Sequence, residues 1–462
     1  MLMHRSSTSI LRRSRLHCNN VRVRSICSAC ATGGHGLETA FELTSTALRY
    51  GEGVTSDAGW DVKHLGASRV AVVVDGALRT QHPGFTILID SLKKHGVEYE
   101  IFDGIVVEPT KHSMEAAVEW TLGRDVDGFV AFGGGSVMDT AKVMNLYKKY
   151  PVEDFDEYVN APVGKGTPVP GPLSPLVAIP TTAGTGSETT GVSIFDVPEI
   201  GAKTGIAHRH LKPSLGLVDP CNTYTLDRWA TTFPGLDVFC HAAESYTARP
   251  YNMRAAAESP ALRPAYQGSS PISDVFAIEA FKLMATNLRL INQDPENKEA
   301  RKGLALASTM AGNAFGNAGV HLCHGTSYPV ASAASKVSPK SYYKSVSKKL
   351  IPHGLSVALP AASVFRITGE SNPEKHLELA SILTGKDVNV SRHGEDAGLV
   401  FSESIRDFLD ELGVPSGLGE LGFTNDDIPS LVKGTLPQKR VLDVAPVEVT
   451  EELLTAVFEG AM

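Results

Sequence analysis

The sequence predicts an α/β lobe built on a parallel sheet, followed by an all-helical lobe. Its 462 residues are enough for two or three domains, and 42% hydrophobic with 20% charged residues is a globular composition. From about residue 60, strand-like runs alternate with stretches of helical spacing. Beyond residue 219 the strand-like runs become rare and long helical stretches follow. We therefore divide the folded part of the chain into residues 38–219 and 220–462.

The first 37 residues differ from the rest in composition. They contain six Arg and many Ser but no Asp or Glu, and the first acidic residue is Glu38. This pattern is typical of a mitochondrial or plastid transit peptide. A basic arm that binds nucleic acid is the alternative. The formal net charge of −8 argues against a nucleic-acid partner and against binding to anionic membranes.

Strand-like and helical stretches alternate in the first lobe. Arg69–Asp75 is a short run rich in Val, as expected for a strand buried in a parallel sheet. The other predicted strands are 98–103, 128–132, 176–179 and 215–218, and the helices between them are 84–95 and 113–122. Such alternation predicts a sheet covered by helices on both faces.

The second lobe is predicted to be helical. The stretches with helical spacing are 235–247, 271–290, 296–315, 353–366, 373–384 and 394–412. Two segments between them, 249–270 and 331–350, are predicted to be irregular because they are rich in Pro, Ser, Arg or Lys. No run of about 18 apolar residues is present, so no membrane insertion is expected.

The first chemical motif is GGGSVMDTAK, residues 133–142, which follows the strand 128–132 and opens a helix. Glycines let the backbone approach a ligand closely, and a helix N-terminus attracts negative charge. The motif therefore predicts an anion site suited to a pyrophosphate. Its spacing differs from GxGxxG, so a tight structural turn is the alternative.

The second motif is PTTAGTGSE, residues 180–188, which follows the strand 176–179. Parallel sheets bind ligands at the carboxyl ends of their strands. A capped helix start at Thr185 or Ser187 is the alternative. Asp75 ends the first strand, where a carboxylate can bind ribose hydroxyls and would favour NAD over NADP, although it could equally form a turn.

A third group of residues lies in the helical lobe. Asp237 and His241 are spaced i, i+4 and share one helix face, and His324 and His353 follow later in the chain. One carboxylate and three imidazoles would form a four-ligand site for a divalent metal, either Fe²⁺ or Zn²⁺. With 15 His in the chain, a chance selection is the alternative.

From about Phe41 to the C-terminus, the motifs GGGSVMDTAK, IPTTAGTGSE, DVFCHAAESY, NAGVHLCHG and PHGLSVALP follow in this order and resemble the iron-containing (group III) alcohol dehydrogenases. The resemblance implies a dinucleotide-binding α/β lobe, a helical metal-binding lobe and an active site between them. It implies that the metal ligands are Asp237, His241, His324 and His353. It implies that the NAD contacts include Asp75, Gly134, Gly135, Ser136, Asp139, Thr181, Thr182 and Lys203.

Three further stretches, 263–274, 317–329 and 431–440, resemble a mitochondrial branch of this family that transfers hydride from a hydroxyacid to an oxoacid. The resemblance implies small-molecule substrates, with 4-hydroxybutyrate oxidised and 2-oxoglutarate reduced through bound NAD(H), and a location in the mitochondrial matrix. A dehydrogenase that releases NADH and a metal-dependent lyase related to dehydroquinate synthase are the alternatives. A homo-oligomer is left open.

Two residues are predicted to act on the substrate. Many family members have His four residues after the third ligand, where this chain has Tyr328; with a reference pKa of about 10, a phenol is a poor proton shuttle, so Tyr328 donates a hydrogen bond or packs. Arg263 is predicted to bind a substrate carboxylate, because a guanidinium binds carboxylates bidentately. Arg249, Arg254 and the lysines of 331–350 are the next candidates, and solvated loop charge is the alternative.

Overall fold

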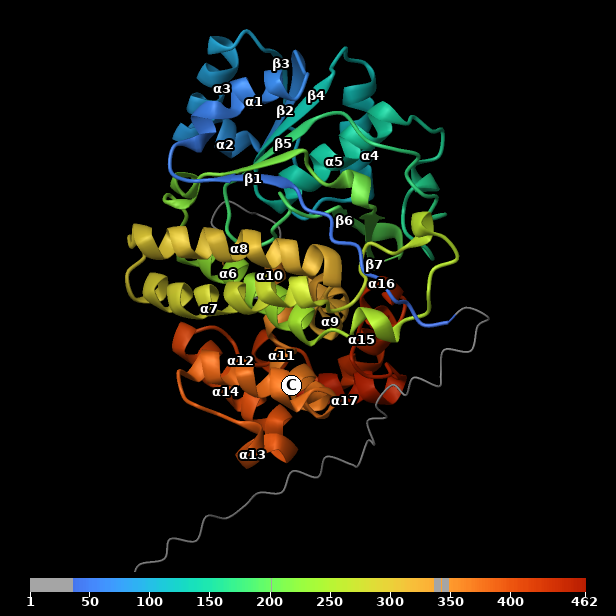
Figure 1. Ribbon diagram of the computed structural model, residues 1–462, viewed down its shortest axis with the longest axis vertical. Helices are drawn as coiled ribbons and strands as arrows, with labels where there is room; N and C mark the ends of the chain where they lie inside the picture. The colour runs from blue at the N-terminus through green and yellow to red at the C-terminus, as the bar shows by residue number, and fades with distance from the viewer. Residues whose placement is uncertain (1–35, 201, 336–341, 343–348) are drawn as a thin grey trace, which may run out of the picture.

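The computed structural model describes residues 36–200, 202–335, 342 and 349–462. Nearly all of the predicted leader, residues 1–37, therefore lies outside the described residues, as does most of the Lys-rich segment 331–350. Figure 1 shows a lobe of strands and helices in the upper half and a helical lobe below it. The predicted fold class, an α/β lobe with a parallel sheet followed by helices, is confirmed.

The sheet of the α/β lobe has six parallel strands in the order β1-β8-β5-β4-β2-β3. Their bounds are β1 (Ala47–Tyr50), β2 (Arg69–Val74), β3 (Glu98–Phe102), β4 (Gly128–Gly133), β5 (Leu176–Pro180) and β8 (Leu215–Val218). In β2, Val72 lies opposite Ile101 of β3 on one side and Val130 of β4 on the other. All the strands predicted from the sequence are present, and β1, which was not predicted, pairs with β8 at the edge.

Helices cover both faces of this sheet, which explains the unbroken apolar run in β2. Val70 and Val72 pack on one face in a cluster with Leu88 of α3, while Ala71 and Val73 pack on the other face with Met138 of α5. The helices of this lobe are α1 (Ala58–His64), α2 (Gly76–Gln81), α3 (Pro83–Lys94), α4 (Lys111–Leu122) and α5 (Gly135–Lys149).

A two-stranded antiparallel hairpin stands apart from the main sheet and was not predicted. It consists of β6 (Val192–Val197) and β7 (Ala202–Ala207), with Asp196 opposite Lys203. In Figure 1 the hairpin lies between the two lobes, near α9 and α16, and β7 contacts α9. It therefore forms one wall between the sheet and the helices.

Among the described residues beyond 219, none forms a strand. The helices are α6 (Arg228–Thr247), α7 (Pro271–Gln293), α8 (Lys298–Ala318), α9 (Leu322–Ser332), α10 (His353–Ala358), α11 (Ala361–Thr368), α12 (Pro373–Thr384), α13 (Val390–His393), α14 (Ala397–Leu412), α15 (Ile428–Thr435), α16 (Lys439–Leu442) and α17 (Glu451–Ala461). None of the helices found among the described residues is both long and apolar enough to cross a membrane.

Two predicted helices have different bounds. The stretch 353–366 is two helices rather than one, because Pro360 lacks the N–H that a continuous helix would need. The helix predicted over 235–247 begins earlier, at Arg228, where the side chain of Asp227 accepts a hydrogen bond from the N–H of Ala230.

Helix α6 lies at the centre of the helical lobe and is buried along most of its length, between α7, α8, α9 and α10. The close approach of α10 requires Gly354, since a Cβ at that position would overlap the carbonyl oxygen of Phe233. This contact sets His353, the first residue of α10, beside α6.

Candidate metal and cofactor site

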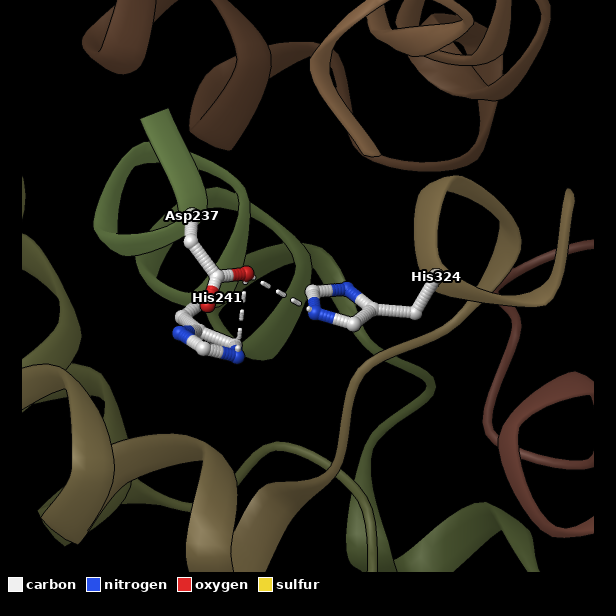
Figure 2. A group of neighbouring side chains, drawn as sticks. All are labelled: Asp237, His241 and His324. Carbon is white, nitrogen blue, oxygen red and sulfur yellow. Dashed lines mark ion pairs between the residues drawn. The ribbon is translucent and has the colours of Figure 1, made fainter. Parts of the chain in front are cut away.

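Four residues predicted from the sequence meet around one carboxylate oxygen. Asp237 and His241 lie one turn apart on α6, His324 comes from α9 and His353 from the start of α10. The Nε2 atoms of His241, His324 and His353 lie 3.5, 3.4 and 3.6 Å from Asp237 Oδ1. Figure 2 shows Asp237 and His241 on one helix, with the ring of His324 reaching toward them from another.

The chemistry of this cluster fits a divalent metal ion. Asp237, His241 and His324 are buried, and in the described part of the chain Asp237 Oδ1 and His324 Nε2 have no hydrogen-bond partner. Burial lowers the pKa of His241 to about 3, so its imidazole is neutral at pH 7 and keeps a lone pair for a metal. A carboxylate and imidazoles suit several first-row metals, so the donor set is compatible with both Fe²⁺ and Zn²⁺.

Glu244 supports this cluster and was not predicted from the sequence. Its carboxylate is fully buried and accepts hydrogen bonds from the N–H groups of His321 (3.0 Å) and Cys323 (2.7 Å) and from Nδ1 of His324. With Nδ1 of His324 bonded to Glu244, the Nε2 atom of the same ring faces Asp237, and it would bind a metal ion once its proton is displaced. A signal was present: Glu244 lies seven residues after Asp237 and three after His241, on the same helix face.

Burial and ion pairing have opposite effects on the pKa values of Glu244 and His324. Burial alone would raise the pKa of Glu244, but the imidazole of His324 and the surrounding N–H groups hold it below its usual value. Burial would also lower the pKa of His324, but the carboxylates of Glu244 and Asp237 raise it well above its usual value. The site therefore keeps its carboxylates ionised in spite of their burial.

Four of the predicted cofactor residues follow the carboxyl ends of neighbouring strands in the sheet. Asp75 follows β2, Gly134 follows β4, and Thr181 with Thr182 follows β5, and these three strands are neighbours. Asp75 accepts a hydrogen bond from the N–H of Ala77 (2.8 Å), so it caps α2 at the carboxyl end of β2. The turn-forming role considered for Asp75 is therefore present in the structure.

The glycines of the first loop motif pack against the threonines of the second. A Cβ on Gly134 would lie 3.3 Å from Thr182 Oγ1, and one on Gly135 would lie 2.7 Å from Thr185 Cγ2. Gly134 is the N-cap of α5 and provides no side-chain cap. The turn is therefore a helix N-terminus with close backbone packing, which is the arrangement that accepts a phosphate group.

Asp139 and Lys203 hold neighbouring segments together. The two carboxylate oxygens of Asp139 accept hydrogen bonds from Ser187 Oγ (2.6 Å) and from the N–H of Ile194 (2.9 Å), which joins α5 to the second motif and to β6. Lys203 on β7 pairs with Glu108 and with Asp196 (3.2 Å). Both residues line the pocket described next, so their contacts also shape its wall.

One pocket of about 150 Å³ joins the two halves of the site. Gly135 and Ser136 of the glycine turn line it together with the four residues of the metal cluster. Tyr328 also lines it, one helical turn after His324, and its hydroxyl accepts a hydrogen bond from Arg440 Nη2 (3.1 Å). The residues of the two lobes thus face a shared space, as the resemblance implied.

Arg263 does not lie in this pocket, contrary to expectation. Its Nε is 3.3 Å from Glu38 Oε2, and it lines a different cavity of about 240 Å³. Arg254 pairs with the same carboxylate, and Arg249 donates to the carbonyl oxygen of Asp443. The reason is that the chain at Glu38 folds back onto the loop 254–263, where its carboxylate pairs with both arginines.

A parallel sheet with a glycine turn at its carboxyl edge, facing a buried cluster of one carboxylate and three imidazoles, is the architecture of a two-lobed dehydrogenase. The chain belongs to the iron-containing alcohol dehydrogenase family. The family model described as iron-containing alcohol dehydrogenase matches residues 45–220, and the model for the C-terminal part of that family matches residues 265–462. The protein is therefore an oxidoreductase, and its family implies NAD(H) and a divalent metal ion.

Relatives and solved structures agree with this assignment. The chain is 49% identical to the mitochondrial hydroxyacid-oxoacid transhydrogenase of Mus musculus over 430 residues, which cover 93% of this chain and 91% of that protein. It is 47% identical to the Homo sapiens protein of the same name, with the same coverage. Among solved structures, the iron-containing alcohol dehydrogenase of Thermotoga maritima is 26% identical with a TM-score of 0.72, covering 91% of this chain and 99% of that one.

Proposed function

We propose that this protein transfers a hydride from 4-hydroxybutyrate to 2-oxoglutarate through NAD(H) that stays bound. The observation that carries the proposal is the convergence of three imidazole Nε2 atoms on Asp237 Oδ1, in a pocket also lined by Gly135 and Ser136 of the glycine turn. The choice of an acid substrate is supported by the names of relatives 47–49% identical to this chain.

The reaction balances in two halves. In the first, the hydroxyl of 4-hydroxybutyrate loses a proton and its carbon loses a hydride to NAD⁺, which gives succinic semialdehyde and NADH. In the second, the keto carbon of 2-oxoglutarate takes the hydride and its oxygen takes a proton, which gives 2-hydroxyglutarate. The cofactor returns to its starting state, so the overall reaction consumes none.

The residues of the chain would divide this work between the lobes. A divalent metal ion held by Asp237, His241, His324 and His353 would polarise the oxygen on the reacting carbon and so favour loss of hydride to the nicotinamide. Glu244 would keep His324 in the tautomer that presents Nε2. Gly134 and Gly135 would let the backbone approach the pyrophosphate.

Isotope transfer tests the proposal. The purified protein is incubated with 4-hydroxybutyrate deuterated at C4, with and without 2-oxoglutarate, and the products are measured by mass spectrometry. We expect succinic semialdehyde and 2-hydroxyglutarate in equal amounts, with the deuterium on C2 of 2-hydroxyglutarate and little free NADH. Release of free NADH without an oxoacid would instead identify a conventional NAD-dependent alcohol dehydrogenase. Failure to oxidise 4-hydroxybutyrate under either condition would reject the proposal.

We also propose that residues 38–219 form the cofactor domain and residues 220–462 the metal domain.

Residues 1–37 are proposed to direct the protein to the mitochondrial matrix. The support for this leader is its acid-free, Arg-rich composition and the mitochondrial names of the relatives. A chain that starts at residue 38 should remain active in vitro and should no longer enter mitochondria. Loss of activity in that truncated chain would contradict the leader assignment.

A further inference from the structure

The pocket contains the guanidinium of Arg440, which forms no ion pair with a carboxylate of the described residues. Arg440 lies on α16, its Nη2 donates to the Tyr328 hydroxyl (3.1 Å), and its guanidinium carbon lies 4.8 Å from the centre of the Tyr266 ring. Its Nη1 is shielded from solvent and has no hydrogen-bond partner within the described ranges, where Arg440 also forms no ion pair. Two phenols therefore contact the guanidinium, and its Nη1 group has no acceptor among the described residues.

A buried arginine elsewhere in the chain shows what is missing at Arg440. Arg301 on α8 gives its hydrogens to the carbonyl oxygens of Pro295, Thr223 and Leu226 at 2.6–2.8 Å. Its charge is thus surrounded by acceptors from the protein itself. A buried donor without an acceptor is unfavourable, and more so when it is charged, so such a group is expected where a ligand supplies the acceptor.

The position of Arg440 defines what kind of ligand that is. Arg440, Tyr328 and Tyr266 line the same pocket as the metal cluster, and Tyr328 follows His324 by one helical turn. The Tyr328 hydroxyl accepts from Arg440 and so keeps its own hydrogen to donate. Lys203 also lines the pocket, but Glu108 and Asp196 neutralise it. Arg440 and Tyr328 together therefore offer donors suited to an anion, at a second position in the pocket.

We propose that Arg440, positioned by Tyr328 and Tyr266, binds the substrate carboxylate and thereby selects acids of one length. This inference rests on the proposed function and names the group that recognises its substrates. 4-Hydroxybutyrate carries its carboxylate three carbon–carbon bonds from the carbon that loses hydride, and 2-oxoglutarate carries its distal carboxylate three bonds from its keto carbon. One guanidinium at a fixed reach from the metal cluster therefore serves both substrates in turn.

The test compares Arg440→Gln with the unaltered enzyme on charged and uncharged substrates. A charge-assisted hydrogen bond to a carboxylate has an effect of about 10- to 150-fold. We expect kcat/KM to fall by about this factor for 4-hydroxybutyrate and for 2-oxoglutarate, and to change less than about threefold for 1,4-butanediol, which lacks a carboxylate. The preference for 4-hydroxybutyrate over 3-hydroxypropanoate and 5-hydroxypentanoate should disappear as well.

Matched variants separate recognition from folding. Arg440→Lys keeps the charge but loses the fork of donors, so it should recover part of the lost kcat/KM. Tyr328→Phe should raise KM for the acids by less than Arg440→Gln does, since it removes only the phenol. Arg263→Gln makes the same exchange at a cation outside the pocket and should leave the acid-to-diol ratio unchanged.

A binding measurement keeps this inference separate from the proposed reaction. Calorimetric titration of the metal- and NAD-loaded enzyme with succinate, a non-reacting dianion, should show binding that Arg440→Gln weakens about tenfold or more. Succinate binding without turnover of 4-hydroxybutyrate would reject the proposed reaction and leave the anion site in place. Equal losses on the acids and the diol, or unchanged succinate binding in Arg440→Gln, would overturn the role of Arg440.

Discussion

The two halves of the pocket are built in different ways. The glycine turn and the threonine loop each come from one continuous segment, they follow strands that are neighbours in the sheet, and their contacts involve backbone. The metal cluster is made from side chains on three helices, with more than 80 residues between His241 and His324. The first half depends on local turns, whereas the second depends on the packing of the whole helical lobe. A substitution in one half should therefore change either metal binding or NAD binding and leave the other intact, which the following substitutions can test.

The largest effect is expected at Asp237, because its Oδ1 is the point on which the three imidazoles converge. Asp237→Asn should reduce turnover about 1000-fold, since stabilisation by a metal amounts to several kcal/mol, and should bring metal content close to zero. Metal analysis and steady-state kinetics measure both, and NAD affinity should stay within about twofold. Asp227→Asn, at the cap of the same helix, is the control. Normal metal content in Asp237→Asn would remove this residue from the ligand set.

A smaller effect is expected at Glu244, which touches His324 rather than a metal. Glu244→Gln keeps an oxygen for the N–H groups of His321 and Cys323 but places an amide where His324 Nδ1 needs an acceptor. Metal affinity should fall about 10- to 100-fold while the protein stays folded. Competition with a chelator measures the affinity, and circular dichroism checks the fold. Unchanged affinity would mean that His324 is oriented without this carboxylate.

In the other half, Gly135→Ala should weaken NAD binding about tenfold, because the added Cβ would lie 2.7 Å from Thr185 Cγ2 and push the two loops apart. Metal content should be unchanged, which is the opposite outcome to that of Asp237→Asn. Fluorescence titration with NADH measures the affinity. Adding Thr185→Ser removes the clashing methyl and should restore part of the binding. A joint loss of metal and cofactor would show that the two halves are coupled.

The smallest effect concerns the core of the helical lobe. His376 is buried beside Phe365 and Phe401, and its Nδ1 donates to the carbonyl oxygen of Asn372 (2.8 Å). Burial lowers the pKa of His376 from 6.5 to about 4. As the pH falls, this imidazole therefore takes up a proton near pH 6.5 in the unfolded chain but only near pH 4 in the folded chain.

Stability should therefore decrease as the pH falls from 6.5 toward 4, and His376 should account for about 1 kcal/mol of this loss at pH 5.5. Urea denaturation at pH 7.5 and 5.5 measures it, and His376→Gln should reduce the difference by that amount. His64→Gln, at an exposed position, serves as the control. An unchanged difference in His376→Gln would assign the acid sensitivity to other groups.

The elements predicted from the sequence are those with a strong local signal. The Val-rich β2 and the glycine turn after β4 were found because burial on both faces and close backbone approach each require particular residue types. The strand β1 was missed because it is four residues long and lies at the sheet edge, where burial imposes no regular pattern. The hairpin of β6 and β7 was missed because its strands lie outside the main sheet, pair mainly with each other and pack against helices α4, α5 and α9.

Local chemistry along the chain was enough to define the order of the lobes, the two loop motifs and the i, i+4 pair of Asp237 and His241, because turns, strand ends and helix faces are set by neighbouring residues. Contacts between distant segments determine whether Arg263 or Arg440 meets a carboxylate. Arg263 meets Glu38 over 225 residues of chain, while Arg440 lies in the pocket and contacts the phenols of Tyr328 and Tyr266. The sequence contains both arginines without distinguishing them, because the partner of a charge depends on how close the folded chain brings it and not on its position along the chain.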